Sequence, residues 1–94
     1  MKYKFNEDKL IQEIKEYIDS TYSQHYAGNG RIQSMDLISA SGKGVDFTLG
    51  NVIKYSARYG KKDGDNRKDI MKIVHYGILA LNEHDIGVKQ SEID

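Results

Sequence analysis

Apolar residues recur at the spacing of an amphipathic α-helix through most of this 94-residue sequence, and the alternation typical of β-strands is almost absent. Leu10, Ile14 and Ile18 follow Asn6, which can cap a helix over about residues 7–22. The chain has no proline and no internal repeat. The pattern therefore predicts an all-α fold, a small single-domain bundle of three to four helices that is expected to form a homo-oligomer.

Turn and loop residues divide the rest of the chain. Residues 23–31 contain two glycines and an asparagine and predict a loop, and the run KKDGDN predicts a turn. The polar residues 83–94 are expected to fray. Three further helices are expected over about residues 34–41, 47–60 and 67–82, with Ser34, Asp46 and Asn66 as their N-caps.

Composition sets the class of protein. With 38% hydrophobic and 30% charged residues, the chain has the composition of a soluble globular protein. It has no apolar run long enough to span a membrane and no signal-peptide pattern, so a cytoplasmic location is expected. It also has no cysteine, which excludes disulfides and thiolate metal sites.

Charge is balanced overall but not locally. The formal net charge is zero, yet residues 54–72 carry a net charge of +4 and residues 73–94 a net charge of −3. A positive region of this size suits a small anion better than a nucleic-acid duplex, so no long nucleic acid is expected as a partner.

The expected helix over residues 47–60 has two different faces. At 100° per residue, one face carries Asn51, Lys54, Arg58 and Lys61. The opposite face is expected to enter the core. It comprises Leu49, Val52, Ile53, Ser56 and Tyr59.

The expected last helix repeats this division. Asp69, Lys72 and Tyr76 share one side, and the other side is apolar. Periodicity leaves open whether the polar faces of the two helices converge or diverge, and a row of basic residues on a helix is often only solvated charge. The apolar side comprises Ile70, Met71, Val74, Ile78 and Leu81.

The sequence gives little support for a metal site. The three histidines are widely separated, and the pair Glu13 and Glu16 has no matching acidic pair later in the chain. The phosphate-binding loop of ordinary nucleotide kinases is also missing. No metal ligand is therefore predicted among the side chains.

Several of these segments occur in an order that resembles the small phage family called SaV-like. They are His25-Tyr26, a short helix over residues 35–38, FTLGNVIKYSARYGKKD over residues 47–63, and DIMKIVHY over residues 69–76. The resemblance covers about residues 24–82. Some members of that family are identified as nucleotide kinases, so it implies a phage-encoded, nucleotide-binding protein acting in the host cytoplasm.

The resemblance also implies roles for particular residues. A phosphate ester needs charge-assisted donors, which an arginine supplies as a fork and a lysine as a point charge. In a kinase, Asp69 would help to hold Mg²⁺ or orient Lys72, with ATP as the donor. The implied catalytic residues are His25, Asp69 and Lys72. The implied nucleotide-binding residues are Tyr26, Asn51, Lys54, Tyr55, Arg58, Lys61, Lys62 and Tyr76.

Three functions stay open at this point. The chain is a nucleoside monophosphate kinase, or it binds a nucleotide or defence signal without turnover, or it is an interaction module that targets a host or immune protein. The first two require the basic face to meet an anion, whereas the third uses its tyrosines and arginine as interface anchors.

Overall fold

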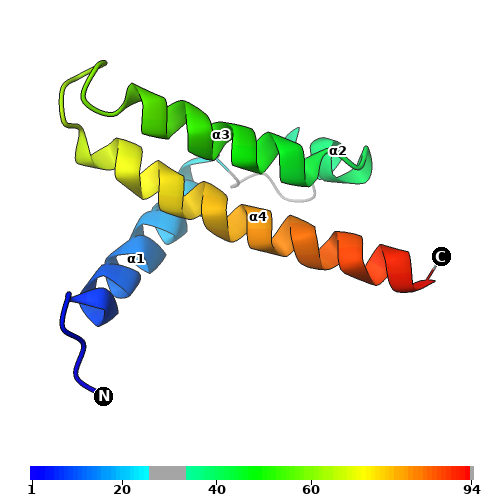
Figure 1. Cartoon of the computed structure of the whole chain (residues 1–94), viewed down its shortest axis with the longest axis horizontal. Helices are drawn as coiled ribbons and strands as arrows, with labels where there is room; N and C mark the ends of the chain where they lie inside the picture. Colours follow the sequence, from blue (N-terminus) through cyan, green and yellow to red (C-terminus); the bar gives the residue numbers. More distant parts are fainter. Residues whose placement is uncertain (26–33, 94) are drawn as a thin grey trace. The chain divides into compact units, whose positions relative to one another are not determined.

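A computed structural model describes residues 1–25 and 34–93 of the chain. Within these residues there are four α-helices and no β-strand, so the predicted all-α class is confirmed (Figure 1). The helices are α1 (Glu7–His25), α2 (Ser34–Ala40), α3 (Gly44–Arg58) and α4 (Arg67–Ile93). The chain divides into two compact units, Met1–Arg31 and Ile32–Asp94. No helix in the described part of the chain is long and apolar enough to cross a membrane.

The first unit contains α1. Glu7 and Asp8 lie in its first turn, where carboxylates interact favourably with the helix dipole. The backbone N–H of Leu10 donates to the carbonyl of Asn6 at 2.9 Å, and Asn6 has a φ of 60°. The helix continues to His25, three residues beyond the predicted end. An exposed Lys15–Asp19 ion pair of 3.2 Å, one turn apart, adds a small stabilisation.

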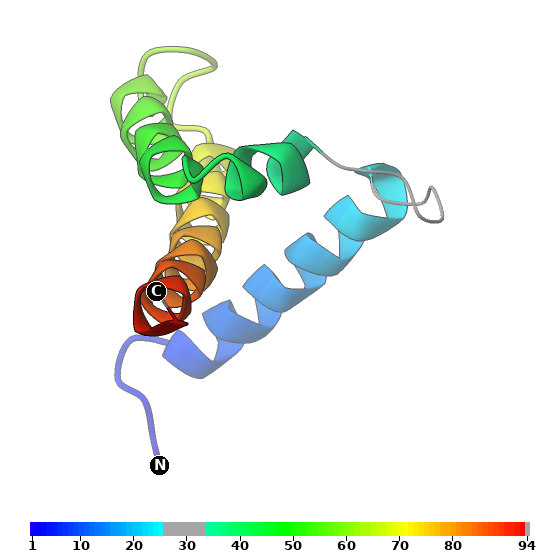
Figure 2. The ribbon, with the colours of Figure 1, turned by 90° about the vertical axis from the view of Figure 1, so that its right-hand side faces the viewer.

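The second unit is built around α3 and α4, which lie side by side and run antiparallel (Figures 1 and 2). The short helix α2 contacts α3. The turn between α3 and α4 includes Gly60, whose φ of 84° lies in the left-handed region that glycine adopts without a steric penalty. Asn66 then caps α4 as predicted, because its Oδ1 accepts the backbone N–H of Lys68 at 3.0 Å.

The start of α3 differs from the prediction. The helix begins at Gly44, Lys43 occupies the N-cap position, and Asp46 lies in the first turn rather than at the cap. The first turn of α3 also approaches α4 closely. A Cβ atom on Gly44 would collide with the carboxylate of Glu83 in α4. A larger residue at position 44 would therefore push the end of the Glu83 side chain aside.

The end of α4 corrects a second prediction. Residues 83–93 were expected to fray, but they continue α4 to Ile93. Glu83 is 8% exposed because it packs against the start of α3, and this contact lies beyond the predicted helix end at Asn82. With no proline in the chain, nothing in the backbone stops the helix after this anchor.

The predicted core faces are also wrong for this unit. The predicted core residue Ile53 is 69% exposed and Leu81 is 66% exposed, and Leu49, Ile70, Val74 and Ile78 are exposed as well. The polar faces of α3 and α4 converge instead. The residues of α3 and α4 that are buried along this contact, called the seam below, are Gly44, Thr48, Tyr55, Asp69 and Glu83.

Candidate functional site

Aromatic rings form the centre of the seam. Tyr55 of α3 and Tyr76 of α4 stack with their ring centroids 5.9 Å apart and their planes 15° from parallel. Phe47 meets Tyr76 edge to face, with centroids 6.2 Å apart at 74°. Such pairs add a directional attraction to the area they bury. The polar faces therefore pack together because they carry these rings.

Three cationic groups surround the buried Tyr55. The Nζ atoms of Lys72 and Lys54 lie 4.9 and 5.1 Å from the centroid of its ring, and the Cζ atom of Arg58 lies 5.8 Å from it. All three distances are within the range of cation–π attraction. We call Lys54, Arg58 and Lys72 the cationic cluster. Because Lys72 comes from α4 and the other two from α3, the cluster exists only when the helices pair.

Arg58 is held by two carboxylates of its own chain. Its Nε lies 3.5 Å from Oδ1 of Asp69, and its Nη2 lies 3.6 Å from Oδ2 of Asp63. Asp69 is only 2% exposed, and its buried Oδ2 has no hydrogen-bond partner among the described residues. A buried carboxylate depends strongly on its ion-pair partner. Arg58 is therefore a structural anchor as well as a candidate ligand group.

The other predicted binding residues are placed differently. Asn51 is half-buried, and its side-chain amide donates to the carbonyl of Phe47 at 3.0 Å. Lys61 and Lys62 lie exposed on the turn after α3, outside the seam. The side chain of His25 and the whole of Tyr26 lie outside the described residues. The structure thus brings together Lys54, Tyr55, Arg58, Asp69, Lys72 and Tyr76.

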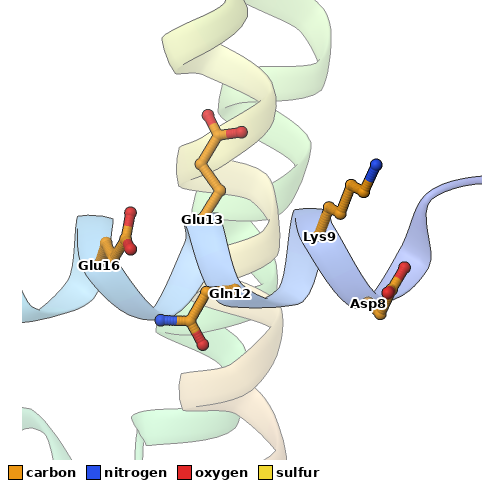
Figure 3. Close-up of a pocket in the computed structure, with 5 residues that line it drawn as sticks. All are labelled: Asp8, Lys9, Gln12, Glu13 and Glu16. Atoms are coloured by element: carbon orange, nitrogen blue, oxygen red, sulfur yellow. The ribbon is translucent and has the colours of Figure 1, made fainter.

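Two surface hollows lie elsewhere. One is on α1 alone and is lined by charged and amide side chains, including Glu13 and Glu16; Figure 3 shows Glu13 and Lys9 pointing to one side of the helix and Gln12 to the other. The second is a groove of about 420 Å³ between the start of α3 and the later turns of α4, beside Glu83. Across the described residues, no group of three or more His, Asp or Glu side chains is arranged to hold a metal ion.

Burial changes the pKa of His75 in the second unit. Its ring lies 6.3 Å from the ring of Tyr76, and burial lowers the pKa of His75 below its ordinary value, because the charged form loses hydration. The imidazole is therefore biased toward its neutral form, and the cationic charge of the seam comes from the cationic cluster around Tyr55.

Two contacts of the site were missed by sequence reasoning. Asp63 pairs with Arg58 across the turn, and Glu83 fills the space beside Gly44. The signal for the second contact was the glycine pair in SGKG, whose last residue begins α3; sequence reasoning assigned this stretch to a helix break. Thr48 was also missed; it is fully buried and donates to the carbonyl of Gly44 at 2.8 Å.

Comparison with known proteins places the chain in a family. Residues 20–77, more than half of the chain, match the family model described as a protein of unknown function, DUF3310, and the chain belongs to that family. The matched stretch includes all of α2 and α3 and the cationic cluster, and it ends before Glu83. Neither a curated protein nor a solved structure matches the chain.

Proposed function

We propose that this protein binds a nucleotide through its phosphate groups at the cationic cluster. One observation carries the proposal: ammonium groups from two different helices, Lys54 and Lys72, lie within 5.1 Å of the centre of the same ring. Among the described residues, neither lysine forms an ion pair with a carboxylate. Asp69 and Asp63 offset Arg58, which leaves both lysines to attract an anionic ligand.

The residues then have distinct roles. Lys54 and Lys72 donate to phosphate oxygens as point charges, and the exposed Lys61 and Lys62 on the adjoining turn extend the positive field. Tyr55 is 8% exposed, so it orients the lysines instead of stacking on a base. Tyr76, which is half-buried, remains the proposed base contact within the seam. His25 and Tyr26 remain proposed ligand contacts from the resemblance to SaV-like phage proteins.

The residues favour binding of a nucleotide without a reaction. Phosphoryl transfer to a nucleoside monophosphate from ATP requires carboxylates that can reach Mg²⁺. Asp69 was the predicted metal-holding group, but it is buried and faces Arg58. The kinase is therefore the alternative proposal, with Mg²⁺ and ATP as its cofactor and donor. A phage origin and a role against a host defence signal follow from the resemblance alone.

Calorimetry with the full chain tests the proposal. Nucleoside mono-, di- and triphosphates and inorganic phosphate are titrated in turn. Lys72→Ala and Lys54→Ala should each weaken nucleotide binding by ~1.5–3 kcal/mol, the usual contribution of a hydrogen bond to a charged group. Lys89→Ala is the matched control, because Lys89 is an exposed lysine of α4 far along the helix from Lys72.

Two results would contradict this proposal. Equal affinity for the Lys72→Ala variant and the parent would remove the cationic cluster from the binding site. Formation of nucleoside diphosphate from ATP and a monophosphate, lost when Mg²⁺ is chelated, would replace the binder with the kinase.

A further inference from the structure

The carboxylate of Glu83 is buried and plays no part in the proposed nucleotide site. Its side chain is 8% exposed, and among the described residues no lysine, arginine or histidine forms an ion pair with it. The neighbouring Asn82 makes one weak contact, with its Nδ2 atom 3.4 Å from Oε2. The first turn of α3 lies beside the carboxylate, and a helix N-terminus supplies about half a positive charge. A buried carboxylate is costly without a full cationic partner, so Glu83 is suited to binding a cation.

The Glu83 carboxylate lines the groove between the start of α3 and the later turns of α4. The groove has a volume of about 420 Å³, which lies within the range of small-molecule sites. Glycines keep it open, because a Cβ atom on Gly42 or Gly87 would meet no other part of the chain within 4 Å. The groove therefore has room for a ligand beside a buried negative charge.

The rest of the lining determines what kind of cation fits. Val45 of α3 is 36% exposed and Ile86 of α4 is 47% exposed, so the groove presents apolar side chains from both helices. Ser39 and Gln90 add polar groups to the lining. A matching ligand carries a positive group for Glu83 and an alkyl chain for the apolar side chains.

We propose that this groove binds a small organic cation, a primary ammonium group on an alkyl chain. The ammonium group donates hydrogen bonds to the Glu83 carboxylate. The alkyl chain lies against Val45 and Ile86 and removes apolar area from water. A metal ion fits less well, since the described part of the chain has no group of three or more His, Asp or Glu side chains arranged to hold one.

This site is separate from the cationic cluster. Glu83 lies about three turns of α4 beyond Lys72, roughly 16 Å along the helix. The groove and the cationic cluster share no residue. The groove therefore stands as a binding site whether or not a nucleotide binds at the cluster.

Titration of the full chain with n-butylammonium, followed by two-dimensional NMR at constant ionic strength, tests the site. The backbone signals of Gly44 and Gly87 should shift as the amine is added. Butyrate, which has a similar alkyl chain but the opposite charge, is the control ligand. It should leave these signals in place, because the Glu83 carboxylate repels it.

Two variants test the charge and the space of the groove separately. Glu83→Gln removes the charge at nearly constant size and should weaken butylammonium binding at least about tenfold. Glu92→Gln, at an exposed glutamate of the same helix, is its matched control. Gly87→Leu should also weaken binding because it fills the groove, whereas Gly50→Leu, at a glycine of α3 outside the groove, should not. Circular dichroism confirms that each variant remains helical.

Three results would overturn the proposal. The first is the absence of any shift in the groove signals up to the highest soluble concentration of butylammonium. The second is an equal response to butyrate. The third is a Glu83→Gln chain that melts at a lower temperature but binds butylammonium as tightly as the parent, which would show that Glu83 only supports the contact between the helices.

Discussion

In most helical proteins the apolar side of a helix is buried and the polar side is exposed, but in α3 and α4 the reverse holds. The seam buries Thr48, Tyr55 and Asp69, whereas large apolar residues on the other side of the two helices, such as Ile53, are exposed. The seam is polar in composition but aromatic in its contacts, because Tyr55 and Tyr76 stack there. Amphipathic periodicity therefore identifies two faces of a helix, but it does not determine which face meets the neighbouring helix.

Tyr55→Ala should have the largest effect on stability, because it removes a buried ring and its stacking partner's contact. We expect a loss of ~3–5 kcal/mol in the free energy of unfolding, measured by urea denaturation. Tyr59→Ala, at the exposed C-cap of the same helix, should change it by less than about 1 kcal/mol. Similar losses for the two variants would abolish the distinction between the seam and the rest of α3.

Asp69→Ala should have the next largest effect. It leaves Arg58 without its buried partner, and breaking a buried ion pair usually costs ~3–5 kcal/mol. Because Arg58 is partly exposed and keeps Asp63, we expect ~2–4 kcal/mol by the same measurement. Asp85→Ala, an exposed aspartate of α4, serves as the control. If Asp69→Ala were as stable as the control, the ion pair would not support the seam.

Gly44→Ala should have a smaller effect that depends on Glu83. The added Cβ forces the Glu83 carboxylate out of its place, so we expect a loss of about 1 kcal/mol, comparable to a lost buried hydrogen bond. In a Glu83→Ala chain, the same change should be neutral or stabilising, because alanine favours the helix over glycine by ~0.5–1 kcal/mol. Equal effects of Gly44→Ala in both chains would show that the two residues do not meet.

The pH dependence of stability should show the smallest effect. Burial lowers the pKa of His75, so the unfolded chain binds the proton more readily than the folded chain. The contribution of His75 is therefore neutral above pH ~6.5 and becomes destabilising as pH falls below that value. His75→Gln should flatten the fall of the melting temperature between pH 7 and pH 5. An unchanged fall in the His75→Gln variant would contradict this role of His75.

Much of the fold follows from the sequence. The four helices and the Asn66 cap are specified by local periodicity and capping chemistry. The predicted start of α3 and the predicted end of α4 were wrong. Both lie next to the contact between Gly44 and Glu83, two residues far apart in the chain. A local pattern contains no information on that contact.

The candidate site was predictable only in part, because it too depends on contacts between residues far apart in the chain. The periodicity placed Lys54 and Arg58 on one face, and Asp69, Lys72 and Tyr76 on another. The sequence left open whether these faces converge. The stacking of Tyr55 on Tyr76 brings them together. The exposure of Ile53 follows from the same packing, since a helix with one neighbour can turn only one face toward it.

The convergence of the polar faces is tested most directly by nuclear Overhauser effects in the full chain. We expect cross-peaks between the ring protons of Tyr55 and Tyr76, whose centroids are 5.9 Å apart. Isotope-filtered mixing of labelled and unlabelled chains should show that these contacts lie within one chain. Intrachain contacts between the methyl groups of Ile53 and Val74, with none between the two tyrosine rings, would contradict it.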